Sequence, residues 1–231
     1  IQQLMRDHGG CFLAVEVGYK YKCFGKDVAR AAKTLGIGSW KDAQLGDMCT
    51  FPTGTLNDKV RRLVHDGHRV AVARQTEVAA LRPKSGGTFS RAVDRVYSKA
   101  TLIGDELGEN NEDAAWLVAC VDTGGKLDLV AVELRSQRRS ALVCEDGAAA
   151  DAFLAAHPPS EALVVGAASE QLMRSTNARV EAFATDGDAE ELLMAYCEAA
   201  GVGHALERCL ERAEATTAPM RLDASTLRDL E

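Results

Sequence analysis

Long apolar runs are missing from this 231-residue sequence: no stretch approaches the roughly 18 consecutive apolar residues that a transmembrane helix requires. The seven cysteines form no CxxC pair, and because they are odd in number and scattered, they indicate neither a zinc site nor a disulfide framework. We expect reduced, buried thiols of the kind found inside cells. No GxxxxGK(S/T) loop occurs, which excludes a P-loop nucleotide site within these residues.

The sequence begins with Ile1 rather than Met, and no basic-then-apolar signal pattern follows. We therefore expect a segment of a longer chain. Hydrophobic residues make up 46% and charged residues 26% of the sequence, which is typical of a soluble globular protein. A length of 231 residues exceeds the common size of one domain, so two compact units are expected.

Positive charge is scarce in the back half of the chain. Residues 106–231 carry 10 Lys and Arg against 24 Asp and Glu, whereas residues 1–105 carry 17 against 10. This asymmetry predicts that only the front half meets a polyanion, because clustered Lys and Arg release counterions from it. Chance drift of surface charge is the alternative explanation.

Hydrophobic periodicity predicts an α/β protein. In the front half it predicts strands over 11–17, 19–24, 48–52, 68–77 and 91–98, and helices over 26–36 and 55–67. Thr55 is the expected N-cap of the second helix. The acidic, Gly/Asn-rich residues 104–113 predict a boundary. A hairpin that turns at Gly124-Gly125 is expected next, followed by alternating strands and helices, and the chain is helical from Asp188 onward.

The segment GYKYKCFG, residues 18–25, alternates aromatic and cationic residues just before a helix. Residues two apart on a strand share a face, so Lys20 and Lys22 are expected to project together while Tyr19 and Tyr21 point the other way. The two ammonium groups suit backbone phosphates, and Tyr19 is a candidate wedge at a bent base step. An edge strand that uses its lysines to prevent pairing with another edge is the alternative.

These residues resemble the MutS family of DNA mismatch-repair proteins. GYKYKCFGKDVARAAKTLGI is similar to the start of its mismatch-recognition domain, a pattern followed by Phe24, Asp27, Ala31, Ala32, Leu35 and Ile37. The segments FPTGTLNDKVRRLVHDGHRVAVARQTE, RVYSKATLIGDE and MRLDASTLRDLE resemble later parts of the family. The resemblance implies a mixed-sheet α+β mismatch-recognition domain over 1–104, an RNase H-like α/β connector domain over 105–187, and the start of an α-helical core or lever region over 188–231.

One departure from the family pattern is informative. Lys20 stands where most relatives have a Phe that stacks on a mispaired base, and Lys22 where they have a Glu that hydrogen-bonds it. The GYKY form, with AALR at residues 79–82, looks like the eukaryotic MutS-homologue-three branch, which binds insertion/deletion loops. The resemblance assigns insertion at the loop to Tyr19 and Lys20, and a phosphate contact to Lys22. Arg91 and Arg95, four apart on a strand, are further DNA-binding candidates, with simple solvation as the alternative.

The resemblance implies binding rather than catalysis by this fragment. No cofactor is expected in it, because the family's ATPase, with its ATP and magnesium, is expected beyond Glu231. The implied partners are double-stranded DNA with extrahelical loops, a second MutS homologue in a heterodimer, and MutL-type proteins. The implied location is the nucleus, with no membrane contact.

Two rival functions stay open. Asp122, Asp128 and Glu133 on the expected hairpin could hold two metal ions for phosphodiester hydrolysis, although Asp is also a routine residue beside a Gly-Gly turn. The acidic back half could be a protein-interaction module, with or without DNA binding in the front half. Trp40 and Trp116 are expected to serve packing.

Overall fold

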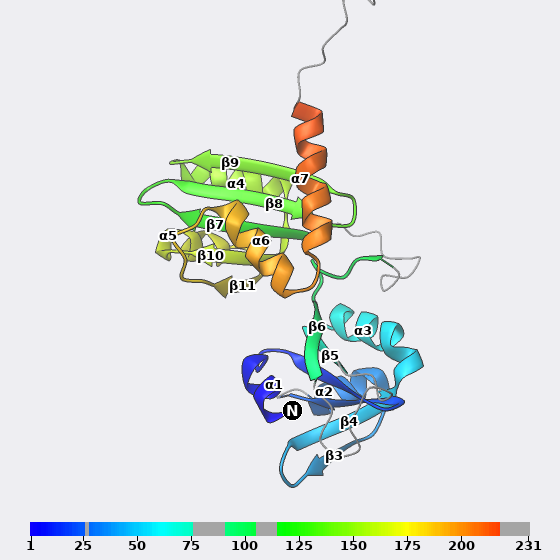
Figure 1. Cartoon of the computed structure of the whole chain (residues 1–231). Coiled ribbons are helices and arrows are strands. Elements are labelled where there is room, and N and C mark those ends of the chain that lie inside the picture. Colours follow the sequence, from blue (N-terminus) through cyan, green and yellow to red (C-terminus); the bar gives the residue numbers. More distant parts are fainter. Residues whose placement is uncertain (26–27, 76–90, 105–114, 218–231) are drawn as a thin grey trace, which may run out of the picture.

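Two β-sheets, each a mixture of parallel and antiparallel strands, form the framework of the protein (Figure 1). The computed structural model describes residues 1–25, 28–75, 91–104 and 115–217. The six-stranded sheet lies within residues 12–97 and the five-stranded sheet within residues 116–182. The predicted α/β class is confirmed. Within the described residues, no helix is both long and apolar enough to cross a membrane.

The first sheet has the strand order β3-β4-β2-β1-β5-β6, with β1 parallel to β5 and the other neighbours antiparallel. The elements of this part are α1 (Gln2–Asp7), β1 (Phe12–Val17), β2 (Lys20–Phe24), α2 (Val28–Leu35), β3 (Ser39–Asp42), β4 (Gly46–Pro52), the 3-10 turn η1 (Thr53–Thr55), α3 (Leu56–His65), β5 (Val70–Gln75) and β6 (Arg91–Tyr97). The strands and helices predicted here are confirmed where the structure describes them. The sequence pattern missed α1 and β3.

Helices α2 and α3 pack on one face of the first sheet because each carries an apolar stripe at helical spacing. The stripe of α2 is the predicted one, and its buried residues are Val28, Ala31, Ala32 and Leu35. Thr55 occupies the N-cap position of α3, but its hydroxyl donates to the carbonyl oxygen of Pro52 at 2.9 Å. The predicted N-cap position of Thr55 is confirmed, but its side chain makes no capping hydrogen bond because the hydroxyl is bonded to Pro52 instead.

The second sheet has the strand order β11-β10-β7-β8-β9. Strands β7, β8 and β9 are antiparallel neighbours, whereas β10 runs parallel to both β7 and β11. The elements of this part are β7 (Trp116–Asp122), β8 (Leu127–Glu133), β9 (Arg138–Cys144), α4 (Gly147–Ala156), β10 (Pro159–Val165), α5 (Ala167–Met173), β11 (Arg179–Ala182), α6 (Ala189–Ala199) and α7 (Gly203–Thr217). The predicted turn at Gly124-Gly125 is confirmed, and both glycines have positive φ.

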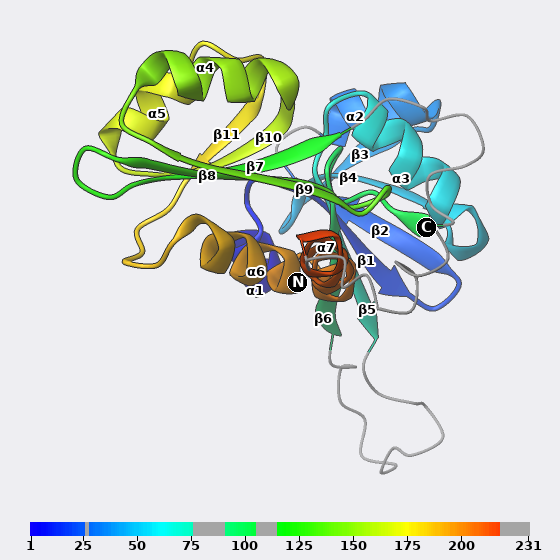
Figure 2. The same cartoon turned by 90° about the horizontal axis from the view of Figure 1, so that it is seen from above.

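Helices cover both faces of the second sheet: α4 and α5 pack on one face, and α6 and α7 on the other (Figure 2). Trp116 and Val118 of β7 face α4 and α5, whereas Leu117 and Ala119 face α6 and α7. Because both faces are buried, β7 is an unbroken apolar run rather than an alternating one. Helices α6 and α7 thus pack directly on the second sheet.

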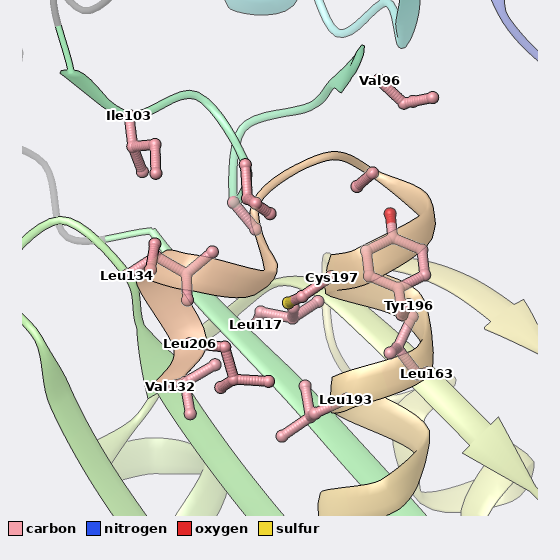
Figure 3. Packing of buried hydrophobic residues seen from close by; sticks show 14 of the residues in the cluster. Val96, Ile103, Leu117, Val132, Leu134, Leu163, Leu193, Tyr196, Cys197 and Leu206 are labelled. Carbon is pink, nitrogen blue, oxygen red and sulfur yellow. The ribbon is translucent and has the colours of Figure 1, made fainter. Parts of the chain in front are cut away.

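The turn between α6 and α7 joins the two sheets. The carbonyl oxygen of Ala200 accepts a hydrogen bond of 3.1 Å from the amide of Val96 on β6, the edge strand of the first sheet. Gly201 has a φ of +76°, and a Cβ atom there would lie 2.7 Å from the carbonyl oxygen of Asp94, so only glycine fits without a shift. Apolar side chains from both sheets surround this contact (Figure 3), among them Val96, Ile103, Leu134 and Tyr196.

A buried carboxylate anchors the same junction. Glu161 on β10 is 1% exposed, and it accepts hydrogen bonds from the Tyr196 hydroxyl of α6 at 2.8 Å and from the Ser98 hydroxyl, just after β6, at 2.5 Å. Arg69, which precedes β5, places its Nε 3.8 Å from Glu161 and its Nη1 2.5 Å from Glu181. Burial, together with the Glu161 charge, raises the pKa of Tyr196, so its phenol stays a protonated donor. The buried charge is therefore paired from both sheets.

We expect Glu161→Ala to lower the free energy of unfolding by about 3 kcal/mol, because the Arg69 guanidinium loses one of its two carboxylate partners at a buried site. The exposed Glu145, which pairs with Lys126 at 3.2 Å, provides the control, and Glu145→Ala is expected to cost less than about 1 kcal/mol. Urea denaturation of the three proteins measures both values. Equal losses in the two variants would contradict the role assigned to Glu161.

Candidate nucleic-acid interface

A two-residue turn, Gly18-Tyr19, connects β1 to β2. Val17 pairs with Lys20 across it, and of the two turn residues only Gly18 has a positive φ, +62°. This is the pattern of a type II′ hairpin turn, which favours glycine at its first position. The amide of Thr53 donates to the carbonyl oxygen of Tyr19 at 3.1 Å. The backbone at Tyr19 is therefore held by the pairing of Val17 with Lys20 and by the Thr53 amide, and the Tyr19 side chain projects from this fixed turn.

Tyr19 and Tyr21 lie in opposite environments. Tyr19 is 76% exposed, and the Lys20 Nζ lies 5.4 Å from its ring centroid. Tyr21 is 3% exposed, with its ring centroid 5.6 Å from that of Phe51, and burial raises the pKa of its phenol. The prediction that the two tyrosines point the same way is wrong, because Tyr19 belongs to the turn and not to the strand. An exposed ring and an ammonium group thus lie together at the hairpin tip.

Lys20 and Lys22 are both exposed on β2 and alternate with the buried Tyr21 and Cys23. The two lysines therefore share a face, as the alternation predicts. Strand β2 is hydrogen-bonded to β1 on one side and to β4 on the other. The alternative explanation, lysines that protect an edge strand, is wrong because β2 has no free edge.

The face that carries the lysines continues onto β4 and β3. Lys22 pairs with Thr50 of β4, and Trp40 of β3 pairs with Met48, two residues from Thr50, so Trp40 shares this face. Trp40 is 48% exposed, which corrects the expectation that it serves packing alone. An exposed indole beside cationic side chains is a surface on which a base can stack. No sequence pattern points to Trp40, because the four-residue strand β3 is too short to show a periodicity.

Arg91 and Arg95 lie on opposite faces of β6. Arg91 pairs with Gln75 and Arg95 with Val72, and Asp94 is an extra residue between the two pairs. This bulge shifts the alternation by one residue, so side chains four apart no longer share a face. The Arg91 Nε donates to the Glu16 carbonyl oxygen at 2.9 Å. Arg91 therefore lies on the same face as Lys20 and Lys22. Arg95 lies on the opposite face, which α2 and α3 cover. The phosphate contacts of both arginines stay predictions.

The three carboxylates of the nuclease alternative have local structural contacts. Asp122 accepts from the Gly124 amide at 3.1 Å, Asp128 from the Ala189 amide at the start of α6 at 3.1 Å, and Glu133 from the Ser136 amide at 3.0 Å. In the part of the chain that the structure describes, no three His, Cys, Asp or Glu side chains are grouped so that they could hold a metal ion. The geometry gives the nuclease alternative no support.

Part of the family resemblance falls outside the described residues, namely residues 26–27, 76–77, 79–82, 105–106 and 220–231. The predicted boundary segment 105–113 also lies outside them.

The front half of the chain is similar in sequence to known DNA mismatch-repair proteins. Residues 2–106 match the family described as MutS domain I. DNA mismatch repair protein MSH3 of Debaryomyces hansenii is 41% identical over 107 residues, which cover 41% of this chain and 10% of the relative. The proteins of that name from Arabidopsis thaliana and Homo sapiens are each 39% identical, over 105 and 108 residues, which cover 44% and 46% of this chain and 10% and 9% of the relatives. The matched part thus spans about a tenth of the length of these relatives.

The two tyrosines of the hairpin provide a direct check of this geometry. We expect Tyr21→Ala to lower the free energy of unfolding by about 3–5 kcal/mol, because it removes a buried ring from the core. Tyr19→Ala removes an exposed ring and is expected to change that free energy by less than about 0.5 kcal/mol. Urea denaturation of both variants measures the difference. A large loss for Tyr19→Ala would show that this ring packs in the fold.

Proposed function

Because residues 2–106 of this chain belong to the MutS family, we propose that the chain acts in DNA mismatch repair by binding duplex DNA that carries extrahelical insertion/deletion loops. The observation that carries this proposal is the hairpin tip, where Tyr19 is 76% exposed beside the Lys20 ammonium. The names of the relatives, DNA mismatch repair protein MSH3, support the repair role.

The chemistry of the hairpin suits a loop better than a single mispaired base. A carboxylate can accept a hydrogen bond from the edge of a mispaired base, whereas the ammonium groups of Lys20 and Lys22 can only donate. An extrahelical loop requires a sharply bent duplex whose displaced phosphates must be held. Tyr19, on a turn with a fixed backbone, supplies an aromatic wedge at the bend. Lys22, further along β2, supplies charge for the backbone.

The remaining residues extend the proposal. We assign residues 1–104 to a mismatch-recognition domain and residues 105–187 to an RNase H-like α/β connector, which the strands and helices of the second sheet support. Residues 188–231 are proposed as the start of a helical core or lever region. The first two helices of that region, α6 and α7, pack on the second sheet.

The properties of the whole protein follow from the same proposal. We propose that it works as a heterodimer with a second MutS homologue, that MutL-type proteins bind it, and that it acts in the nucleus. Its ATPase, with ATP and magnesium, is proposed to lie outside residues 1–231, which would then need no cofactor of their own. The charge asymmetry supports the front half as the main DNA-binding part.

The double variant Tyr19→Ala, Lys20→Ala tests the proposal. We expect it to abolish the preference for a looped duplex over a matched duplex, with a loss of about tenfold or more in affinity for the loop, because stacking contributes about 1–3 kcal/mol per base. Fluorescence anisotropy measures the affinity of the 231-residue chain for three DNA molecules: a duplex with a small extrahelical loop, a matched duplex and a duplex with a G·T mismatch.

Lys33→Ala is the matched control for this test. Lys33 is an exposed lysine on α2, which packs on the opposite face of the first sheet, so its removal is expected to leave the preference intact. If the double variant weakens looped and matched duplexes equally, the hairpin tip contacts only the backbone, and the proposal of loop recognition is wrong.

Lys22→Ala is expected to change the salt dependence rather than the preference. A phosphate contact contributes about one unit to the slope of log K against log salt concentration, so the slope on matched duplex should fall by about one unit. Salt titrations of the wild type, Lys22→Ala and Lys33→Ala measure the three slopes. A slope equal to that of Lys33→Ala would remove Lys22 from the phosphate contacts.

A further inference from the structure

A second cationic surface lies at the junction of the two sheets, away from the hairpin tip. It is a pocket of about 420 Å³ whose walls come from β6, from the turn between β8 and β9, and from the start of α7. Its polar walls are formed by Arg95, Arg135, Gln137, His204 and Arg208. Figure 1 shows α7 rising from this junction. Residues from both sheets are therefore needed to build the pocket.

Among the described residues that line the pocket, the charged side chains are all arginines. Three arginines and one histidine face it, and the described lining residues include no Asp or Glu. His204 and Arg208 are four apart on α7 and so share one side of the helix. Within the described parts of the chain, neither of these two side chains makes a hydrogen bond or an ion pair. The Arg208 guanidinium therefore adds positive charge to the pocket with no ion-pair partner among the described residues.

The local structure holds the arginine on β6 in place. The Arg95 guanidinium lies 4.9 Å from the ring centroid of Tyr97, and its Nη2 is 3.5 Å from the carbonyl oxygen of Thr101. The bulge at Asp94 places Arg95 on the face of β6 opposite to Arg91, at the edge strand of the first sheet, and its side chain lines the pocket from there. Helix α7 adds the positive end of its dipole, because His204 is the second residue of a 15-residue helix.

We propose that this pocket binds a phosphate group. An arginine guanidinium can donate two parallel hydrogen bonds to two oxygens of one phosphate. The N-terminus of a helix also favours a bound anion. The volume of about 420 Å³ exceeds that of one phosphate group. The pocket can therefore also hold part of the molecule that carries the phosphate. The phosphate belongs either to a DNA backbone or to a small phosphate compound. Only the first source rests on the function proposed above.

The variants Arg208→Glu and Arg135→Glu test the site, because both side chains are exposed and their replacement leaves the core intact. Calorimetric titration of the chain with inorganic phosphate measures binding at the pocket directly. We expect the affinity for phosphate to fall about tenfold or more in each variant, because a guanidinium that donates charged hydrogen bonds is replaced by a carboxylate that repels the anion. Anisotropy with matched duplex DNA at several salt concentrations tests whether a DNA phosphate is the ligand.

Arg174→Glu is the control, because its side chain is 77% exposed on the far side of the second sheet, at the end of α5. Weaker phosphate binding with unchanged duplex affinity would identify a small phosphate compound as the ligand. Weaker duplex binding and a slope reduced by about one unit, relative to Arg174→Glu, would identify a DNA phosphate. Results equal to those of Arg174→Glu in both titrations would overturn the inference. Loop preference depends on Tyr19 and Lys20, so either proposal can fail without the other.

Discussion

The carboxylate of Glu161 is the contact on which the arrangement of the two sheets depends. A charge that is 1% exposed must be paired or it destabilises the fold, and every partner of Glu161 arrives from a different element. Ser98 follows β6, Arg69 precedes β5, and Tyr196 belongs to α6. The first sheet can therefore satisfy this charge in only one position relative to the second. The Ala200–Val96 backbone hydrogen bond fixes the same position from the turn between α6 and α7.

This junction is continuous with the proposed DNA-binding hairpin. The carbonyl oxygen of Arg69 accepts a hydrogen bond of 2.7 Å from the amide of Phe12, the first residue of β1. Strand β1 then pairs with both β5 and β2, and it ends at the turn that presents Tyr19. One strand thus connects the buried Glu161 contacts to the exposed ring. A wedge at a bent duplex needs such a support, because a ring on a loose loop would lose its contact energy to conformational entropy.

The fold was predictable from the sequence wherever it rests on local periodicity. The stripe of α2, the turn at Gly124-Gly125 and the alternation of Lys20 and Lys22 are local patterns, and the structure has them. Contacts between distant segments left no such signal. The residues around Asp94 contain no pattern that predicts a bulge. The single Glu161 within SEALVV does not indicate that Arg69 and Tyr196 will contact it. Trp40 was missed for a related reason, since a four-residue strand carries too little pattern to identify.

The basic pocket shows why net charge is a poor guide to where an anion binds. Residues 106–231 carry 24 acidic against 10 basic side chains, and this excess predicts that the back half avoids phosphates. Yet Arg135, His204 and Arg208 come from that half, and the fold places them beside Arg95 from the other. At an ionic strength of about 0.15 M, charges more than about 8 Å away are largely screened. Distant acidic charges therefore affect the pocket less than the arginines that line it, and the proposed phosphate site takes most of its cationic side chains from the acidic half.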